Sequence, residues 1–203
     1  MRPHEHSRLD LRQPIGIFTR GKLAGLGGDF AECRALLRGA DVRHDVLPAV
    51  RQSEQCGYDN GVRLAAGGAR RIGFAPTRPG VSCPVAAALA MWEWNVVEPA
   101  ALRHFGMRVA RIEHLGSYSC RRLYGRASGG WSEHAAANAI DVAGFRLADG
   151  TAISVLDDWK GEGARAAFLR EVRGGGCRLF STVLSPDYND AHRDHLHLDM
   201  ARW

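Results

Sequence analysis

The chain has 203 residues, of which 45% are hydrophobic and 24% are charged, a composition typical of an ordinary folded domain. Lys and Arg outnumber Asp and Glu by 27 to 22, but the basic residues are scattered and do not interleave with aromatic residues as they do in nucleic-acid grooves. No stretch approaches the roughly 20 apolar residues that span a bilayer. We therefore expect neither a nucleic-acid partner nor a membrane span in this chain.

Residues 1–80 are interpreted as an irregular N-terminal extension packed on the core. The first ten residues, MRPHEHSRLD, lack the apolar core of a secretory signal, so the sequence shows no export route. A helix is predicted over residues 29–39, with Asp29 as its cap and Gly39 as its stop. Glycines and prolines then interrupt the chain between Cys56 and Gly80.

The pattern becomes regular in residues 81–203, which we take as a second unit. A long helix is predicted from Ser82 to Gly106, with Trp92 and Trp94 as packing residues. Strands are predicted at 108–115, 139–147 and 177–185, and a further helix at 162–176. Helices and short strands without regular βαβ alternation favour an α+β fold, with a small antiparallel sheet flanked by helices.

The stretch SEHAAANAID places His134 and Asp141 seven residues apart. In a helix they would lie about 10 Å apart along the axis, too far to share a metal ion. If Asp141 lies on a strand, it points away from Ile140 and Val142 and to the same side as Phe145, and a loop carrying His134 can fold back over it. Taken alone, the pair is better explained by a surface histidine and a capping aspartate.

A second cluster, AHRDHLHLDM, strengthens the metal hypothesis. On a strand, His195, His197 and Asp199 would share one face, while Leu196, Leu198 and Met200 would face the core. A chance group of exposed histidines is the alternative, but the apolar alternation favours an ordered sheet. His134, Asp141 and one imidazole of this cluster would form the ligand set of a catalytic zinc site, built by a loop and two strands.

Both stretches resemble known zinc metallopeptidases. SEHAAANAID resembles the SxHxxGxAxD motif of the group that includes D-Ala-D-Ala carboxypeptidases and dipeptidases, with Ala137 in place of the glycine. HRDHLH is similar to the HxxHxH segment of penicillin-insensitive murein endopeptidases. The runs SCPVAAALAMW, GSYSCR, SEHAAANAIDVAGF and VLSPDYNDAHRDHLHLDM resemble the bacterial extensin-like C-terminal domain of the same group, over residues 82–203.

This resemblance implies roles for single residues. His134, Asp141 and His197 correspond to the zinc ligands, and His195 to the imidazole beside the metal. Asp194 stands where the dipeptidases have a general base. The remaining two correspondences are His192, which matches a non-ligand histidine of the murein endopeptidases, and Arg121, which matches an arginine that holds a substrate carboxylate.

Two of these assignments stay open. The base is either Asp194 or His195, and Asp194 qualifies only if the strand begins no earlier than His195 and the preceding residues form a loop. Arg122 or Arg126 would serve as well as Arg121.

The expected function is zinc-dependent hydrolysis of peptide bonds in bacterial peptidoglycan stem peptides, as a D,D- or L,D-endopeptidase or carboxypeptidase. Zinc would activate water for attack on an amide, and a carboxylate or imidazole would transfer the proton. The main alternative is a non-catalytic, zinc-containing cell-wall binding module. A third reading is a purely structural histidine cluster, which would hold no metal.

Five cysteines without a CxxC pair favour an oxidising, periplasmic or extracytoplasmic location, with at least one cysteine unpaired. The missing export signal then implies that the start of the chain is incomplete or misassigned. We expect a disulfide between Cys120 and Cys177 to brace the site, and we leave the partners of Cys33, Cys56 and Cys83 open.

Overall fold

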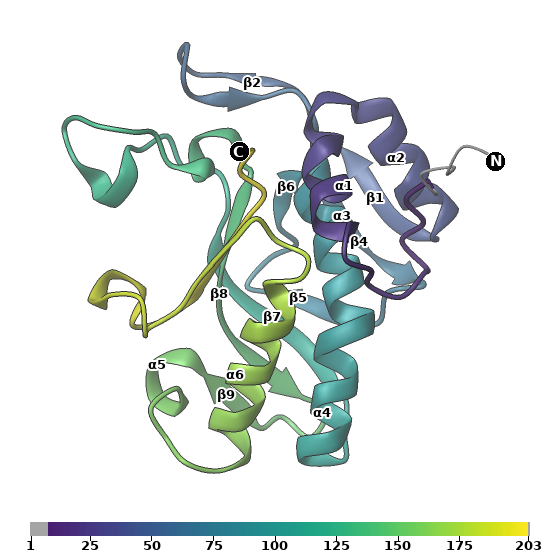
Figure 1. The fold of residues 1–203 in the computed structure, drawn as a ribbon, viewed down its shortest axis with the longest axis vertical. Helices are drawn as coiled ribbons and strands as arrows, with labels where there is room; N and C mark the ends of the chain where they lie inside the picture. The colour runs from purple at the N-terminus through teal and green to yellow at the C-terminus, as the bar shows by residue number, and fades with distance from the viewer. Residues whose placement is uncertain (1–7, 203) are drawn as a thin grey trace, which may run out of the picture.

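The computed structural model describes residues 8–202. Residues 1–7, part of the ten-residue stretch compared with a secretory signal, lie outside this range, as does the C-terminal Trp203. Two layers organise the chain: a central sheet and a set of helices packed against one of its faces (Figure 1). None of the helices within the described residues is long and apolar enough to cross a bilayer.

The central sheet has six strands in the order β10-β11-β8-β7-β5, with β9 also paired to β8. Every pairing is antiparallel except that of β5 with β7. This arrangement confirms the mixed α+β class with an antiparallel sheet and helices. The strands are β5 (Gly73–Ala75), β7 (Val109–Gly116), β8 (Ala139–Leu147), β9 (Ala152–Ser154), β10 (Thr182–Leu184) and β11 (Leu196–Asp199).

A long helical segment covers the core face of the sheet. It consists of α3 (Cys83–Trp92), a π-helical turn (Glu93–Val97) and α4 (Glu98–Phe105). As predicted, the Ser82 side chain caps its start, and it ends at Gly106, which adopts the left-handed conformation with φ 63°. Trp92 packs against Phe145 and Phe180, which confirms its role in the core.

Of two further helices, α6 (Ala164–Gly176) packs against α4 and the π-helical turn, and α5 (Val155–Asp158) lies against α6 and β9. The strand predicted over 177–185 is wrong for its first half, because only Thr182–Leu184 pair with β11. The amides of Arg178, Leu179 and Phe180 instead donate to carbonyls of Gly175 and Gly176. The free carbonyls at the end of α6 are thereby satisfied by tight turns, and no ladder forms there.

The alternation predicted along β8 is also corrected. Phe145 lies on the core face with Val142, not on the face of Asp141. Glu113 pairs with Gly144 but the next residue, His114, pairs with Val142, so the ladder skips one residue of β8 at this point. This irregularity reverses the side-chain alternation downstream of Val142.

The N-terminal part packs against the same helices. It contains α1 (Thr19–Gly25), α2 (Phe30–Gly39), a sheet of β1 (Val42–Val46), β4 (Gly61–Gly68) and β6 (Gly80–Ser82), and the hairpin β2 (Val50–Arg51) and β3 (Gly57–Tyr58). Asp29 caps α2 as predicted. A disulfide joins Cys33 of α2 to Cys83 of α3, and a buried ion pair joins Arg70 to Glu93 at 2.9 Å.

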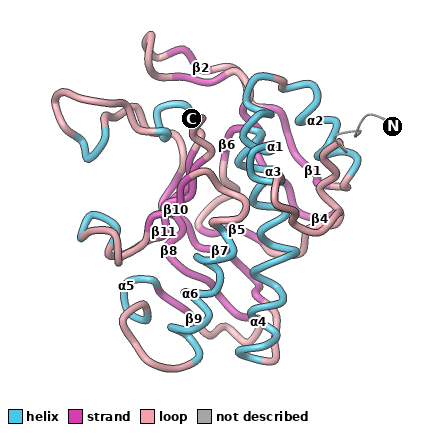
Figure 2. The backbone as a smooth tube through the Cα atoms, in the orientation of Figure 1, coloured by secondary structure: helices cyan, strands magenta, loops and turns pink. Residues whose placement is uncertain are grey.

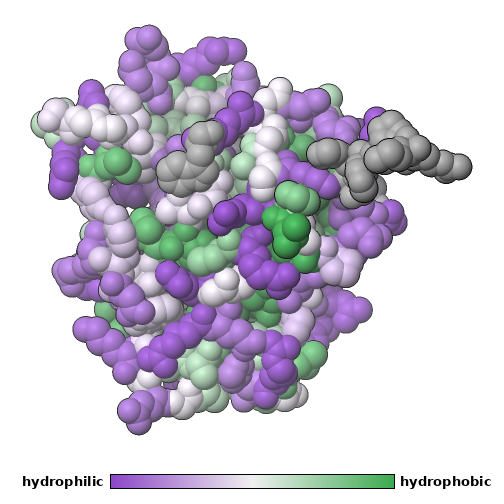
Figure 3. All heavy atoms as spheres, in the orientation of Figure 1, coloured by the Kyte–Doolittle hydropathy of each residue, from purple (hydrophilic) through white to green (hydrophobic). Residues whose placement is uncertain are grey.

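The domain boundary expected near residue 80 stays a prediction. The two parts nevertheless share one sheet, because β5 from the N-terminal part pairs with β7. The largest of the fully buried side chains include Trp92, Phe145 and Phe168. The face seen in Figure 3 is mainly hydrophilic, with smaller apolar patches.

Two loop segments extend from the sheet on the side opposite the helices (Figure 2). We call residues 117–132 the first arm and residues 185–195 the second arm. The first arm carries a 3₁₀ turn at Leu123–Gly125, and the second carries one at Asp190–His192. The candidate site lies where these arms leave β7, β8 and β11.

Candidate metal centre

Three side chains from separate elements converge at the edge of the central sheet. Asp141 on β8 lies directly opposite His197 on β11 in the antiparallel register. His134 comes from a 3₁₀ turn, Glu133–Ala136, that folds back over β8. One ligand atom from each of the three lies within 4.8 Å of the others. The loop-over-strand arrangement predicted for this pair is the observed one.

The turn that carries His134 depends on Ser132 and Ala137. The Ser132 hydroxyl accepts a hydrogen bond from the His134 amide at 3.3 Å, and so caps the turn. Ala137, with φ 52°, ends the turn in the left-handed conformation that glycine adopts most easily. This is the position where the resembling motif has glycine. The turn keeps its shape with alanine, at a cost in backbone strain.

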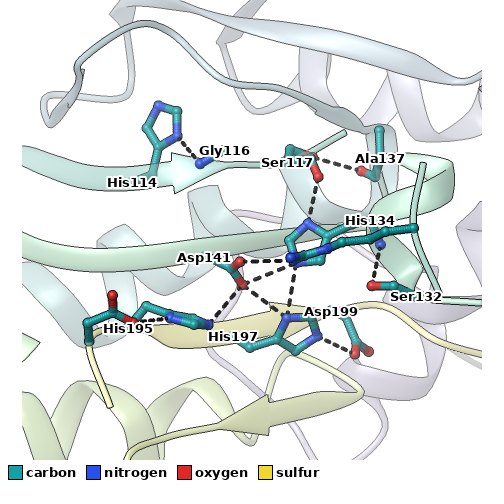
Figure 4. A network of polar contacts seen from close by, with 12 residues as sticks. His114, Gly116, Ser117, Ser132, His134, Ala137, Asp141, His195, His197 and Asp199 are labelled. Atoms are coloured by element: carbon teal, nitrogen blue, oxygen red, sulfur yellow. Dashed lines mark hydrogen bonds and ion pairs between the residues drawn. The ribbon is translucent and has the colours of Figure 1, made fainter. Parts of the chain in front are cut away.

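Each histidine of this trio uses its outer nitrogen to donate to a protein oxygen (Figure 4). His134 Nδ1 lies 2.6 Å from the Ser117 carbonyl oxygen, and His197 Nε2 lies 2.9 Å from an Asp199 carboxylate oxygen. Because these oxygens only accept, the outer nitrogens carry the protons. When a ring is neutral, its inner nitrogen therefore turns a lone pair toward Asp141, which is how proteins orient histidine ligands of a metal.

The inner atoms form a nearly regular triangle. His134 Nε2 lies 3.2 Å from Asp141 Oδ1 and 3.3 Å from His197 Nδ1, and the third edge, between His197 Nδ1 and Asp141 Oδ1, measures 3.0 Å. Two ligands bound at 2.0–2.1 Å to a tetrahedral zinc ion lie about 3.3 Å apart. In both donor type and spacing, the three residues fit a zinc ion with a fourth position left for water.

The electrostatics of the trio favour a cation at its centre. Burial raises the pKa of Asp141, but the contacts with the His134 and His197 imidazoles outweigh it and hold that pKa well below its usual range. Burial lowers the pKa of His197, but hydrogen bonds to Asp141 and Asp199 raise it to about 9. Without a metal, a proton on His197 therefore supplies the positive charge that the buried carboxylate requires.

His195 approaches the trio from the start of β11 but is not one of its three ligands. Its Nε2 lies 3.6 Å from Asp141 Oδ1, and its Nδ1 lies 2.8 Å from Asp194 Oδ1. Asp194 precedes the strand, as its candidacy required, but its half-exposed carboxylate contacts His195 and none of the trio. Of the two residues considered as the base, His195 is therefore the one that faces the trio.

His192 lies behind His195 on the second arm. Its Nδ1 lies 2.6 Å from the Asn189 amide oxygen, and its ring is 5.2 Å from that of His195. Burial, together with the neighbouring His195 and His197, lowers the pKa of His192 to about 4. His192 is therefore neutral, and its Nδ1 is engaged by Asn189. Its ring forms part of the wall of the site.

The three arginines considered on the first arm have separate surroundings. Arg121 extends toward the trio, with Nη2 3.6 Å from Asp141 Oδ2. Arg122 stacks on Trp131 at 4.5 Å, and Arg126 stacks on Tyr124 at 5.3 Å. Only Arg121, of these three, has an ion pair with the trio and also lines the cleft described below.

A cleft of about 760 Å³ opens between the two arms above the trio. Its rim carries exposed apolar and aromatic residues, among them Leu115, Tyr124 and Tyr188. The Asn189 amide donates to the Tyr124 hydroxyl at 3.2 Å and so connects the second arm to the first. The cleft therefore has room for a ligand beside the trio.

The first arm is anchored by a disulfide other than the expected Cys120–Cys177 bond. Cys120 pairs with Cys56 of the β2–β3 hairpin, and Cys177 is a free thiol. Tyr118 reinforces this anchor with a hydrogen bond to Gln52 at 2.6 Å and an edge-to-face contact with Tyr58. The Cys120–Cys177 expectation placed Cys177 on a strand, whereas it lies at the end of α6.

A family model for the extensin-like protein C-terminus matches residues 31–203. The chain belongs to this family. The match begins upstream of Ser82, so the extensin-like region includes all of α2 except Phe30, the β1-β4-β6 sheet and the β2–β3 hairpin that anchors the first arm. No curated protein and no solved structure gave a significant match.

Two residues that orient the trio in this extensin-like chain, Asp199 and Ser117, and one that orients His192, Asn189, were missed or left without a role. Asp199 was placed on the face of His197 by strand alternation, and the H-x-D spacing would have indicated its contact with that histidine. The Ser117 carbonyl and Asn189 have no comparable pattern in the sequence. Both contacts arise from loop conformations that sequence periodicity does not encode.

Proposed function

We propose that the protein is a zinc-dependent peptidase that cleaves peptide bonds in bacterial cell-wall peptidoglycan. The observation that carries this proposal is the triangle of His134, Asp141 and His197, with edges of 3.0–3.3 Å between two inner imidazole nitrogens and a carboxylate oxygen. The motif resemblance to D-Ala-D-Ala carboxypeptidases and murein endopeptidases supplies the substrate class. The two disulfides fit a protein that works outside the cytoplasm.

A zinc ion held by the trio would make a bound water acidic and polarise the carbonyl of the scissile bond. Asp194 fixes the proton of His195 on Nδ1, which leaves Nε2 as a free base directed toward the trio. His195 would accept a proton from the attacking water and return it to the leaving amine. Asp194 then acts through His195, as the carboxylate does in other carboxylate–histidine pairs.

Arg121 is suited to hold a carboxylate of the substrate. Its side chain is about half exposed, at 48%, and lines the cleft beside Asp141. Guanidinium groups bind carboxylates through two parallel hydrogen bonds, which fix the orientation of the ligand. A stem peptide anchored there would extend along the cleft past His195, with its amide next to the trio.

The alternative, a zinc-containing binding module without catalysis, requires a different role for His195. In such a module all four zinc positions would be taken by the protein, and His195 would have to supply the fourth. Among the residues that the structure describes, the group whose ligand atoms lie within 4.8 Å of one another contains His134, Asp141 and His197 but not His195. This favours an open fourth position and therefore the peptidase.

The test is digestion of purified peptidoglycan, and of soluble muropeptides, by the zinc-loaded protein, with products identified by mass. Release of a terminal residue would indicate a carboxypeptidase, and separation of cross-linked stems an endopeptidase. Zinc content is measured on the same sample. Stoichiometric zinc without any turnover would overturn the peptidase and leave the binding module, and a protein that binds no zinc would overturn both.

A further inference from the structure

A buried histidine beneath the site, His114 on β7, is hydrogen-bonded on both ring nitrogens. Its Nε2 lies 2.8 Å from the Thr77 carbonyl oxygen, and its Nδ1 lies 3.1 Å from the Gly116 amide nitrogen. The carbonyl accepts and the amide donates, so His114 carries its proton on Nε2 and uses Nδ1 as an acceptor. It is held as a single neutral tautomer and takes no part in the triangle.

The hydrogen bond to Gly116 closes a β-bulge. His114 pairs with Val142, but Gly116 pairs with the next residue back, Asp141, which leaves Leu115 as an extra residue in β7. Gly116 has φ 115°, a conformation that residues with a side chain rarely adopt. Bulges of this kind redirect the chain beside functional sites. His114 therefore holds the end of β7 bent at the point where it faces Asp141.

The bend determines where the Ser117 carbonyl points. Its oxygen accepts from His134 Nδ1 at 2.6 Å, while the Ser117 hydroxyl donates to the Ala137 carbonyl at 3.3 Å (Figure 4). The direction of this carbonyl sets both the ring orientation and the tautomer of His134. Any relaxation of the bulge would turn His134 Nε2 away from Asp141.

We propose that His114 is a positioning residue for the metal centre, acting through Gly116 and the Ser117 carbonyl on His134. Its expected effect on zinc affinity rests on the proposed metal site. We call the series of contacts from His114 through Gly116 and Ser117 to His134 the relay. The relay does not depend on the metal site, because all of its contacts lie within the protein.

Simple packing is the competing explanation for His114. Its ring contacts Phe74 edge-on, with ring centres 6.2 Å apart. If His114 served only packing, phenylalanine would replace it with little loss of zinc affinity. It would then make no difference which of the two His114 hydrogen bonds a variant keeps. If the relay matters, the acceptor for the Gly116 amide is the part that must be kept.

Two amide substitutions separate the hydrogen bonds of His114. In His114→Asn, the side-chain oxygen can accept from the amide two residues ahead, the usual asparagine turn, so the bulge is retained. In His114→Gln, the longer amide can reach the Thr77 carbonyl but does not form that turn. We expect His114→Asn to keep zinc affinity within about threefold, and His114→Gln and His114→Phe to lose about 10- to 100-fold.

Zinc affinity is measured by competition with a chelator, and the hydrogen bond of His134 Nδ1 by nitrogen-15 NMR of the metal-free protein. His104→Asn on α4, where the wild-type ring contacts Glu171 at 2.6 Å, is the control for loss of a half-buried histidine. It should change neither quantity. The two His114 amide variants stay informative if His114→Phe does not fold.

Equal zinc affinity and an unchanged His134 resonance in His114→Asn and His114→Gln would overturn the relay. So would a loss of affinity in both variants that follows their thermal stability. If the wild-type protein binds no zinc, the metal proposal fails by itself. The His134 resonance of the metal-free variants then still decides whether His114 positions that ring.

Discussion

His134 Nε2 and His197 Nδ1 lie 3.3 Å apart, although the residues are separated by 63 positions and come from a turn and a strand. Each ring is held by an oxygen acceptor on its outer side, Ser117 for His134 and Asp199 for His197. Two imidazole lone pairs and a carboxylate that face one another repel unless a cation lies between them. A cation between His134, His197 and Asp141, either a proton or a metal ion, is therefore required.

Substitutions at the site should separate metal binding from catalysis. Asp141→Ala and His197→Ala each remove a ligand, so zinc content and peptidoglycan hydrolysis should be lost together. His195→Ala should keep near-stoichiometric zinc and lose turnover by about 10²- to 10⁴-fold, the usual range for a general base. Asp194→Asn should cost less, since it acts through His195.

Metal content and hydrolysis rate are measured for all four variants, with Asp190→Ala as the control. Asp190 lies on the same arm and its side chain is 90% exposed, so neither quantity should change. Full zinc in both Asp141→Ala and His197→Ala would contradict the ligand assignment. Loss of zinc in His195→Ala would make His195 a fourth ligand and favour the binding module.

Zinc binding should be coupled to the proton on His197. The pKa of His197 in the folded, metal-free protein is about 9, above its ordinary value of 6.5. Protonation therefore stabilises the metal-free protein below pH 6.5, and this contribution is lost as the pH rises through 9. Zinc replaces this proton, so the affinity for zinc should rise over the same range.

Calorimetric titration at pH 7.5 in two buffers of different ionisation enthalpy gives the number of protons released, expected to be about one. Denaturant unfolding of the metal-free protein at pH 6.5 and pH 9 should give a lower midpoint at the higher pH. His197→Gln should remove most of this difference. Proton-independent zinc binding by the wild type would contradict the coupling.

The left-handed turn at Ala137 should tolerate glycine but not a branched side chain. Ala137→Gly relieves about 1–2 kcal/mol of backbone strain, offset by a lost buried methyl group and by chain entropy, so the change should stay within about 1 kcal/mol. Ala137→Val should destabilise by about 3 kcal/mol, because the residue is fully buried at φ 52°.

Urea unfolding measures both changes. Ala136→Val is the matched control, because Ala136 is the exposed neighbour in the same turn and lacks a positive φ. It should change the free energy of unfolding by less than about 0.5 kcal/mol. Equal destabilisation by valine at both positions would mean that the backbone conformation of Ala137 is not the cause.

Removing the Cys56–Cys120 disulfide should release the first arm locally. The two disulfides close similar lengths of chain, 64 and 50 residues, so the chain-entropy model gives both a stabilisation of about 4 kcal/mol. Only Cys56–Cys120 lies in the arm. Its double serine variant should become sensitive to trypsin at Arg121 and Arg126 under native conditions.

The Cys33→Ser and Cys83→Ser double variant is the control, since that bond joins α2 to the core helix α3. It should lower the unfolding midpoint without selective cleavage in the arm. Cleavage sites are identified by peptide mass at short digestion times. The same cleavage pattern at the same rate in both variants would show that the Cys56–Cys120 bond does not anchor the arm.

Local features of this chain could be read from its sequence. The cap at Ser82 and the stop at Gly106 were correct, because capping depends on residues next to one another in the chain. The alternation of HLHLDM placed His195 and His197 on one face, since β-strand periodicity is a local property. The two motifs therefore indicated the candidate ligands, and strand geometry indicated how they would be presented.

Other features were decided only by tertiary structure. The partner of Cys120 depends on where the β2–β3 hairpin packs, and Phe145 reached the core through an irregularity in the β7–β8 ladder. The choice between Asp194 and His195 as the residue facing the trio rests on the path of the second arm. Such contacts join segments far apart in the chain, and their geometry follows from packing, which no local residue pattern specifies.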